Sequence, residues 1–119
     1  MQFIRNTNLD QFQVILFRCM QSCSAIIYRI GGVIGSSVEQ FNKPSGLCVD
    51  RSNNLIIADE GNSRILMYRA RDGARAACSF QKVITRDVYV PKAVSINIHE
   101  NLVVCDCNSD NFLKIFKYK

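Results

Sequence analysis

Short apolar runs separated by turn-forming residues recur along most of the chain. The runs Leu55–Ile57, Ile65–Tyr68 and Leu102–Val104 are continuously apolar and do not alternate with polar residues. A short run of this kind, rich in β-branched and aromatic residues, favours a strand that is covered on both faces. The segments Asp50–Asn54 and Glu60–Ser63 supply residues that suit tight turns. The pattern therefore predicts an all-β protein built from short antiparallel strands.

The order of these features repeats at a fixed interval. Pro91 lies 47 residues after Pro44, and Asp106 lies 47 residues after Asp59. A period in the forties that contains several short strands is typical of one four-stranded blade of a β-propeller. Both prolines come just before predicted strands, where the missing backbone N–H costs no ladder hydrogen bond. The interval predicts two successive blades.

The first copy of the repeat resembles the NHL repeat, a sequence motif whose copies form the blades of a propeller. The resemblance starts at a glycine-rich lead-in, Ile30–Gly35, and continues through Phe41-x-x-Pro44-x-Gly46-Leu47-x-Val49-Asp50, Asn54-Leu55-Ile56-Ile57-Ala58-Asp59 and Gly61-Asn62-x-Arg64-Ile65-x-x-Tyr68. The second copy is degenerate, because Ala93, Asn97 and Phe112 replace the glycine, the first aspartate and the arginine. The positions to which the resemblance assigns a structural role are Pro44, Gly46, Asp50, Asp59, Asn62, Arg64, Pro91 and Asp106.

This resemblance implies a partial β-propeller of about two and a half blades, each built of four antiparallel strands. Residues 1–30 are expected to be the remnant of a preceding blade, with an outer strand near Ser24–Ile30. Residues 31–84 are the first full repeat, and residues 85–119 are a second, degenerate repeat that closes at the C-terminus. The strands of the first full repeat are expected near Gly46–Asp50, Leu55–Asp59, Arg64–Tyr68 and Ala77–Ile84. Closed propellers have ~4–8 blades, so we expect missing upstream blades or self-association.

Composition and charge narrow the possible locations and partners. The most apolar stretch, Val14–Ile30, contains Arg18 and Arg29, which argues against a membrane span. Six cysteines without a visible secretory signal indicate a reducing, cytoplasmic location. A formal net charge of +5 favours a polyanionic partner.

Residues that could support catalysis or bind a metal are few. The single histidine, His99, lies in a predicted turn without a nucleophile motif nearby. Asp59 and Asp106 end predicted strands, where a carboxylate typically accepts N–H bonds from the adjoining turn. The pairs Cys105-x-Cys107 and Cys19-x-x-x-Cys23 lack the two-pair arrangement of zinc sites, so buried reduced thiols are expected. We therefore expect no enzymatic activity, metal or cofactor.

Within the NHL family, the best resemblance is to the C-terminal propellers of tripartite-motif proteins and their Brat-like relatives. The chain finishes, as such propellers tend to, on a short basic and aromatic segment, Ile115–Lys119, expected to be a strand that closes the last blade. The resemblance implies a module that recruits RNA or protein for a post-transcriptional or ubiquitin-ligase regulator. Brat-like propellers bind RNA at the end that carries the connections between blades. There, the candidate contacts for single-stranded RNA are Lys43, Arg86, Tyr89 and Lys92, since lysine and arginine bind phosphates and tyrosine stacks on a base.

Several alternatives to RNA binding stay open. The same end carries Glu60 and Asp110, which suit a protein partner or a solvated surface without a ligand. The chain could also be a truncated gene product without independent activity. An NHL propeller enzyme of the peptidyl-amidating lyase type would need metal-binding histidines and a secretory route, which this sequence lacks.

Overall fold

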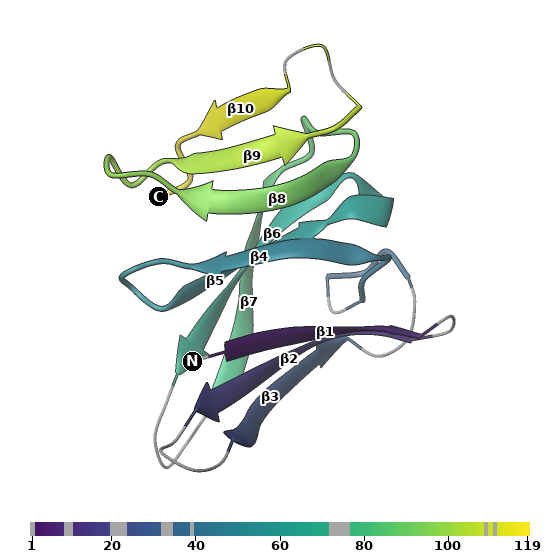
Figure 1. Cartoon of the computed structure of the whole chain (residues 1–119), viewed down its shortest axis with the longest axis vertical. Coiled ribbons are helices and arrows are strands. Elements are labelled where there is room, and N and C mark those ends of the chain that lie inside the picture. The colour runs from purple at the N-terminus through teal and green to yellow at the C-terminus, as the bar shows by residue number, and fades with distance from the viewer. Residues whose placement is uncertain are drawn as a thin grey trace.

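The computed structural model describes the backbone of residues 2–8, 11–19, 24–31, 35–38, 40–71, 77–108, 110 and 112–119. Side chains are described from residue 35 onward, except at 39, 70–77, 109 and 111. Within these ranges the chain forms ten strands in three antiparallel sheets, together with one 3-10 turn (Figure 1). The predicted all-β class is confirmed. No helix in the described part of the chain has the length and apolar character that a membrane span needs.

The three sheets follow one another along the sequence. The first has the order β1 (Gln2–Asn8), β2 (Gln11–Cys19) and β3 (Ser24–Gly31). The second has the order β4 (Pro44–Val49), β5 (Asn54–Asp59), β6 (Arg64–Arg71) and β7 (Ala77–Thr85), with the turn η1 (Glu60–Asn62) between β5 and β6. The third consists of β8 (Pro91–Ile96), β9 (Leu102–Asp106) and β10 (Leu113–Phe116). All four strands predicted for the first full repeat form, while the division of the chain at residues 31 and 85 stays a prediction.

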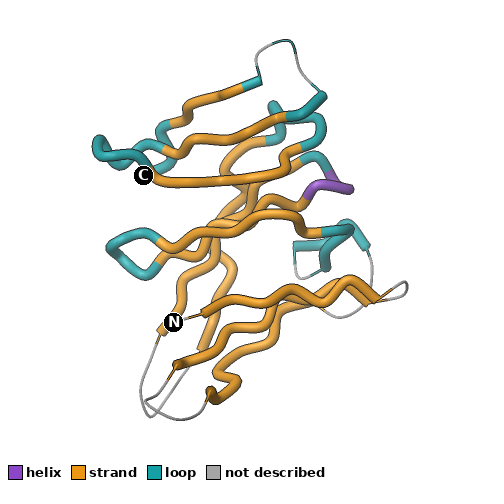
Figure 2. The backbone as a smooth tube through the Cα atoms, viewed as in Figure 1, coloured by secondary structure: helices purple, strands orange, loops and turns teal. Residues whose placement is uncertain are grey.

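The four-stranded sheet lies in the middle of a stack of three (Figure 1). Its first strand, β4, contacts β8 of the third sheet and also β1 and β2 of the first sheet, while β7 contacts β3. The first strands of the three sheets are therefore neighbours, as they are around the axis of a propeller. Loops gather at two ends of the stack (Figure 2). The connection end holds residues 35–38, 40–43, 60–63 and 86–90, and the turn end holds residues 50–53 and 97–101.

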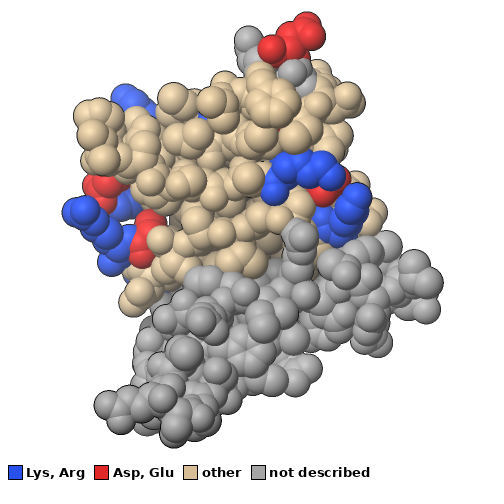
Figure 3. Space-filling model, viewed as in Figure 1, with Lys and Arg blue, Asp and Glu red and all other residues tan. Residues whose placement is uncertain are grey.

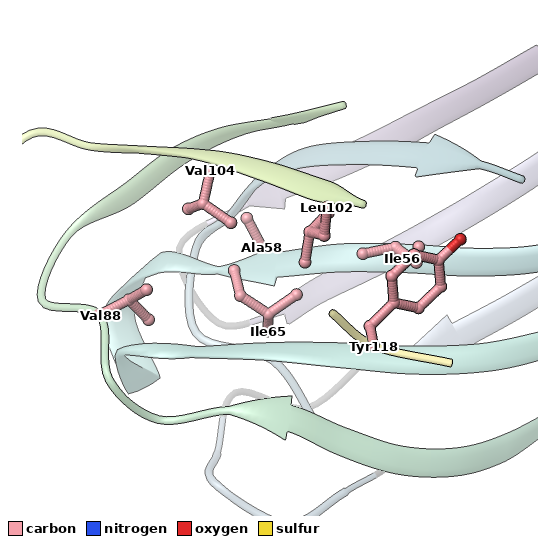
Figure 4. Close-up of a cluster of buried hydrophobic side chains, with 7 residues drawn as sticks. All are labelled: Ile56, Ala58, Ile65, Val88, Leu102, Val104 and Tyr118. Atoms are coloured by element: carbon pink, nitrogen blue, oxygen red, sulfur yellow. The ribbon is translucent and has the colours of Figure 1, made fainter. Parts of the chain in front are cut away.

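Packing on both faces explains why the apolar runs are continuous. All six residues of β5 are buried, and successive side chains of a strand point to opposite faces. Leu55 and Ile57 therefore enter one core cluster with Leu66 and Tyr68. The opposite face of the middle sheet packs against the third sheet and forms a second cluster, drawn in Figure 4, of Ile56, Ala58, Ile65, Val88, Leu102, Val104 and Tyr118.

The C-terminal segment ends inside this second cluster. β10 stops at Phe116, so the strand expected over Ile115–Lys119 covers only the first two of these residues. Tyr118 is buried, and its hydroxyl donates a hydrogen bond of 2.8 Å to Oδ2 of Asp50. Its carbonyl oxygen accepts a hydrogen bond from the Lys82 ammonium. These contacts fix the end of the chain to the middle sheet.

Gly46 is required where the middle and third sheets approach most closely. A Cβ atom at this position would lie 3.0 Å from Cα of Ala93 and 3.0 Å from the carbonyl oxygen of Lys92. Both are backbone atoms, so neither can move aside without displacing β8. One residue earlier, the Ser45 hydroxyl donates a 2.6 Å hydrogen bond to the carbonyl oxygen of Pro91. The structural role that the sequence assigns to this glycine is thus a close backbone contact between sheets.

Replacing Gly46 with valine should destabilise the protein by about 1–3 kcal/mol, because an extra side chain forces β4 and β8 apart. Valine has the higher intrinsic preference for strands, so a loss of stability can only come from the packing. Urea unfolding measures the effect, with Gln81→Val at an exposed position of β7 as the control. Equal stability of the two variants would refute a close contact at Gly46.

Candidate functional site

A buried ion pair lies where β5 ends and β6 begins. Asp59 and Arg64 are partners across the two strands, and both side chains are almost completely buried. Oδ2 of Asp59 accepts hydrogen bonds from Arg64 Nε at 2.9 Å and from Asn62 Nδ2 at 2.8 Å. Oδ1 accepts the backbone N–H of Asn42 at 2.8 Å. The structure therefore brings together three residues that the repeat motif singles out.

The remaining donors of this network hold the loop that leads into β4. The Arg64 guanidinium donates to the carbonyl oxygens of Ser36 at 2.7 Å, Ser37 at 2.7 Å and Gln40 at 2.9 Å. Asn62 Nδ2 also donates to the carbonyl oxygen of Gly35 at 2.7 Å. A planar guanidinium with donors in a fixed fork is suited to this task. The motif residues thus fix the connection between the first and second sheets to the middle blade.

The second repeat achieves the same connection with a different cation. Asp106 accepts the backbone N–H groups of Tyr89 at 3.0 Å and Val90 at 2.8 Å, as Asp59 does with Asn42. Its positive partner is Lys114, whose Nζ lies 3.2 Å from Oδ2 of Asp106. Position 112, which corresponds to the arginine of the motif, holds the exposed Phe112. Burial raises the pKa of Asp106, but the two N–H groups and Lys114 outweigh it and lower the pKa overall.

Sequence comparison of the repeats missed Lys114 because it lies two positions beyond the expected arginine. A shift of two residues keeps a side chain on the same face of a strand, so the lysine can still reach the buried carboxylate. The basic residue two places after Phe112 was the signal that could have revealed it. The Lys114 ammonium also lies 5.4 Å from the centre of the Tyr89 ring.

The turn end shows a similar replacement. In the first repeat, Oδ1 of Asp50 accepts the backbone N–H groups of Ser52 at 2.8 Å and Asn54 at 2.9 Å. In the second, Oδ1 of Asn97 accepts those of His99 and Asn101, each at 3.0 Å. Only an acceptor oxygen is needed for this kind of turn, so asparagine can replace aspartate there.

The second carboxylate oxygen of Asp50 has hydrogen-bond partners of its own. Oδ2 of Asp50 accepts hydrogen bonds from Asn54 Nδ2 and from the Tyr118 hydroxyl, both at 2.8 Å. Burial raises the pKa of Asp50, but the Asn54, Tyr118 and Ser52 hydrogen bonds outweigh burial and lower the pKa overall. Burial and the Asp50 carboxylate raise the pKa of the Tyr118 phenol. At neutral pH the pair is thus a phenol that donates to a carboxylate.

Two of the four predicted binding residues meet at the connection end. The ammonium groups of Lys43 and Lys92 lie 3.4 Å and 2.5 Å from the same oxygen, Oε1 of Glu60. Both lysines are exposed, whereas the Glu60 side chain is buried. Burial raises the pKa of Glu60, but the two lysines outweigh it and lower the pKa overall, which keeps the carboxylate charged at neutral pH. Figure 3 shows basic side chains gathered around an acidic one where β4 and β8 begin.

Tyr89 lies next to this group, and Arg86 does not join it. The Tyr89 side chain is 61% exposed, and its carbonyl oxygen accepts a 2.7 Å hydrogen bond from Ser63, which directly follows η1. Arg86 is exposed in the same connection, and within the described residues no polar contact links it to the other three. The structure therefore brings Lys43 and Lys92 together, and it places the Tyr89 backbone beside Ser63 and the Tyr89 ring beside Lys114. Arg86 comes one residue before Asp87, whose carbonyl accepts a hydrogen bond from Lys114 at 3.0 Å.

The sequence also led to predictions about metal-ligand groups and cysteines, and the described residues bear on both. They contain no group of three or more His, Cys, Asp or Glu side chains placed to hold a metal ion. Burial raises the pKa of Cys48 to about 12 and that of Cys78 to about 11, which leaves both thiols protonated. Sγ of Cys105 lies 3.9 Å from Sγ of Cys107, and Cys107 is exposed, so the expectation that these thiols are buried is wrong for Cys107. The side chains of the other predicted pair, Cys19 and Cys23, lie outside the described residues.

Comparison with known proteins identifies the repeat. Residues 41–68 match the family model described as NHL repeat. No curated protein matches the chain. The matched segment runs from Phe41 to Tyr68, and it contains Asp59, Asn62 and Arg64. The chain therefore carries an NHL repeat, a repeat typical of binding or scaffold modules.

The two ion pairs should differ in their contribution to stability. Arg64→Met leaves the buried Asp59 carboxylate without its cation and should cost about 3–5 kcal/mol. Lys114→Met should cost less, about 1.5–3 kcal/mol, because Asp106 keeps two backbone donors. Urea unfolding of both variants tests this, with Arg69→Met at an exposed position of β6 as the control. If the two losses are equal, the arginine network does not hold the loop in place.

Proposed function

We propose that this chain is a non-catalytic binding module whose connection end binds single-stranded RNA. The observation that carries the proposal is the meeting of Lys43, in the connection before β4, and Lys92, the second residue of β8, at the same Glu60 oxygen. Their ammonium groups are exposed, and one carboxylate serves two cations, so positive charge is left over for a ligand. The resemblance to tripartite-motif and Brat-like propellers supports a role in post-transcriptional regulation.

Tyr89 supplies a second kind of contact on the same surface. Its ring is exposed in the connection between β7 and β8, three residues before Lys92, and the Lys114 ammonium lies over it. An unstacked base can occupy an exposed aromatic face of this kind, while the lysines contact the phosphates on either side of it. The net charge of +5 adds a general attraction for a polyanion. Charge and a stacking surface together favour single-stranded RNA over a duplex, whose bases are not free to stack.

We expect the lysines and Tyr89 to contribute to RNA affinity in different ways. The double variant Lys43→Ala/Lys92→Ala should weaken binding to all sequences and reduce the slope of log K against log salt by about 0.7 for each lost phosphate contact. Tyr89→Ala should cost about 1–3 kcal/mol through lost stacking. Fluorescence polarisation with a pool of short single-stranded RNAs measures both effects on the full chain.

Two further variants separate this surface from general charge effects. Arg51→Ala/Arg69→Ala removes the same formal charge near the turn end and should change affinity far less. Glu60→Gln removes the carboxylate that neutralises the two lysines, so it should increase affinity. Equal losses in the two double variants, or weaker binding by Glu60→Gln, would contradict an RNA surface at Lys43 and Lys92. An unchanged affinity in every variant would instead favour a protein partner.

A further inference from the structure

The turn end carries a large apolar side chain in an exposed position. Ile98, in the turn between β8 and β9, is 93% exposed. Counting back by the repeat interval of 47, its counterpart in the first repeat is Arg51. Arg51 is exposed too, although the third sheet follows the sheet to which its turn belongs. Exposure at this position is therefore a property of the turn, whether or not another sheet follows, and the second repeat places isoleucine there.

Ile98 lies at the mouth of a hollow between the two turns. The hollow has a volume of about 240 Å³, and Val49 and Ile96, at the ends of β4 and β8, supply apolar walls. It lies between the middle and third sheets, so both of its sides belong to the described part of the chain. Small-molecule and cofactor sites typically have ~300–1,000 Å³. The smaller hollow suits a single apolar side chain of a partner.

The charge left over at the hollow is positive. Charged side chains of both signs gather at the turn end, on the left of Figure 3. Arg51 and Glu100 line the hollow from opposite turns. Oε1 of Glu100 lies 3.2 Å from Nζ of Lys119, whereas no carboxylate among the described residues forms an ion pair with Arg51. The Asp50 carboxylate, the other acidic group of the lining, is buried and already accepts hydrogen bonds at both oxygens. An acidic group of a partner therefore complements Arg51.

Asn97 adds a hydrogen-bond donor to the same lining. Its Oδ1 closes the turn by accepting two backbone N–H groups. Its Nδ2 has no acceptor among the residues that the structure describes, so it can donate to a backbone carbonyl of a bound chain.

We propose that the turn end binds an acidic peptide segment of a partner protein. A large apolar side chain of the peptide enters the hollow beside Ile98, and a neighbouring acidic side chain pairs with Arg51. An exposed apolar residue next to a small hollow with polar groups around it is typical of a protein contact surface. This surface lies at the opposite end from Lys43 and Lys92, so it is independent of RNA binding at the connection end.

Pools of short synthetic peptides and amide NMR spectra of the full chain test the proposal. One pool has leucine or phenylalanine between aspartate and glutamate residues. A second pool has serine at the apolar position, and a third has lysine at the acidic positions. The first pool should shift the signals of Arg51, Asn97 and Ile98 saturably, and the other two pools should leave them unchanged. The control signal is that of Lys92, which should stay in place with all three pools.

Substitutions at exposed positions separate this contact from a change in fold. Ile98→Ser should weaken binding of the first pool about tenfold, the loss that one interface anchor typically causes. Ser52→Ala, at an exposed position of the neighbouring turn and outside the lining of the hollow, is the matched control and should bind as the wild type does. Ile98→Ser should keep its affinity for RNA, and Lys43→Ala/Lys92→Ala should keep its affinity for the peptides, so either surface can fail alone.

Three results would overturn the peptide surface. The first is the absence of saturable shifts at the highest soluble peptide concentration. The second is an equal response to the serine or lysine pool, or an unchanged affinity in Ile98→Ser. The third is a shift of the same signals by single-stranded RNA, which would assign the turn end to a nucleic acid.

Discussion

The structure depends on one constraint, which is that β5, inside the middle sheet, has two apolar faces and both must be removed from water. All six residues of β5 are buried, and its four apolar side chains divide between two core clusters on opposite sides of the sheet. Each fully buried aliphatic side chain contributes about 1.5–3 kcal/mol, and this gain is available only when a neighbouring sheet covers it. Stacking of sheets is therefore the condition for folding, and the close contact at Gly46 follows from it.

Stacked sheets need connections of defined shape, and buried carboxylates provide them. Asp59 and Asp106 each accept backbone N–H groups from the segment that leads into the first strand of a sheet. The cation beside each carboxylate differs. In the first repeat it is Arg64, which donates four hydrogen bonds. In the second it is Lys114, whose side chain is more exposed. Because these connections are held in place, Lys43 and Lys92 reach the same oxygen of Glu60.

Much of the fold could be predicted from the sequence, because the determining signals are local. The continuous apolar run in β5 and the turn residues on either side of it indicate a buried strand without any knowledge of its neighbours. Asp50 and Asn97 each use a side-chain oxygen to close the corresponding turn. The motif alone did not reveal this shared role, because it contains aspartate at that position. The position of Tyr118 was also not predictable, because its burial depends on a gap between two sheets and on the distant Asp50. The meeting of Lys43, Lys92 and Glu60 is likewise a consequence of how the sheets stack.

The central claim is that the sheets share their core and therefore fold as one unit. Urea unfolding followed by amide NMR signals tests this directly, by comparison of Ile57 in β5 with Val104 in β9. Both residues are completely buried, and they belong to different sheets of the stack. The shared core predicts that the two signals disappear at the same urea concentration. Loss of the Val104 signal while that of Ile57 persists would show that the third sheet unfolds independently, which would contradict the account.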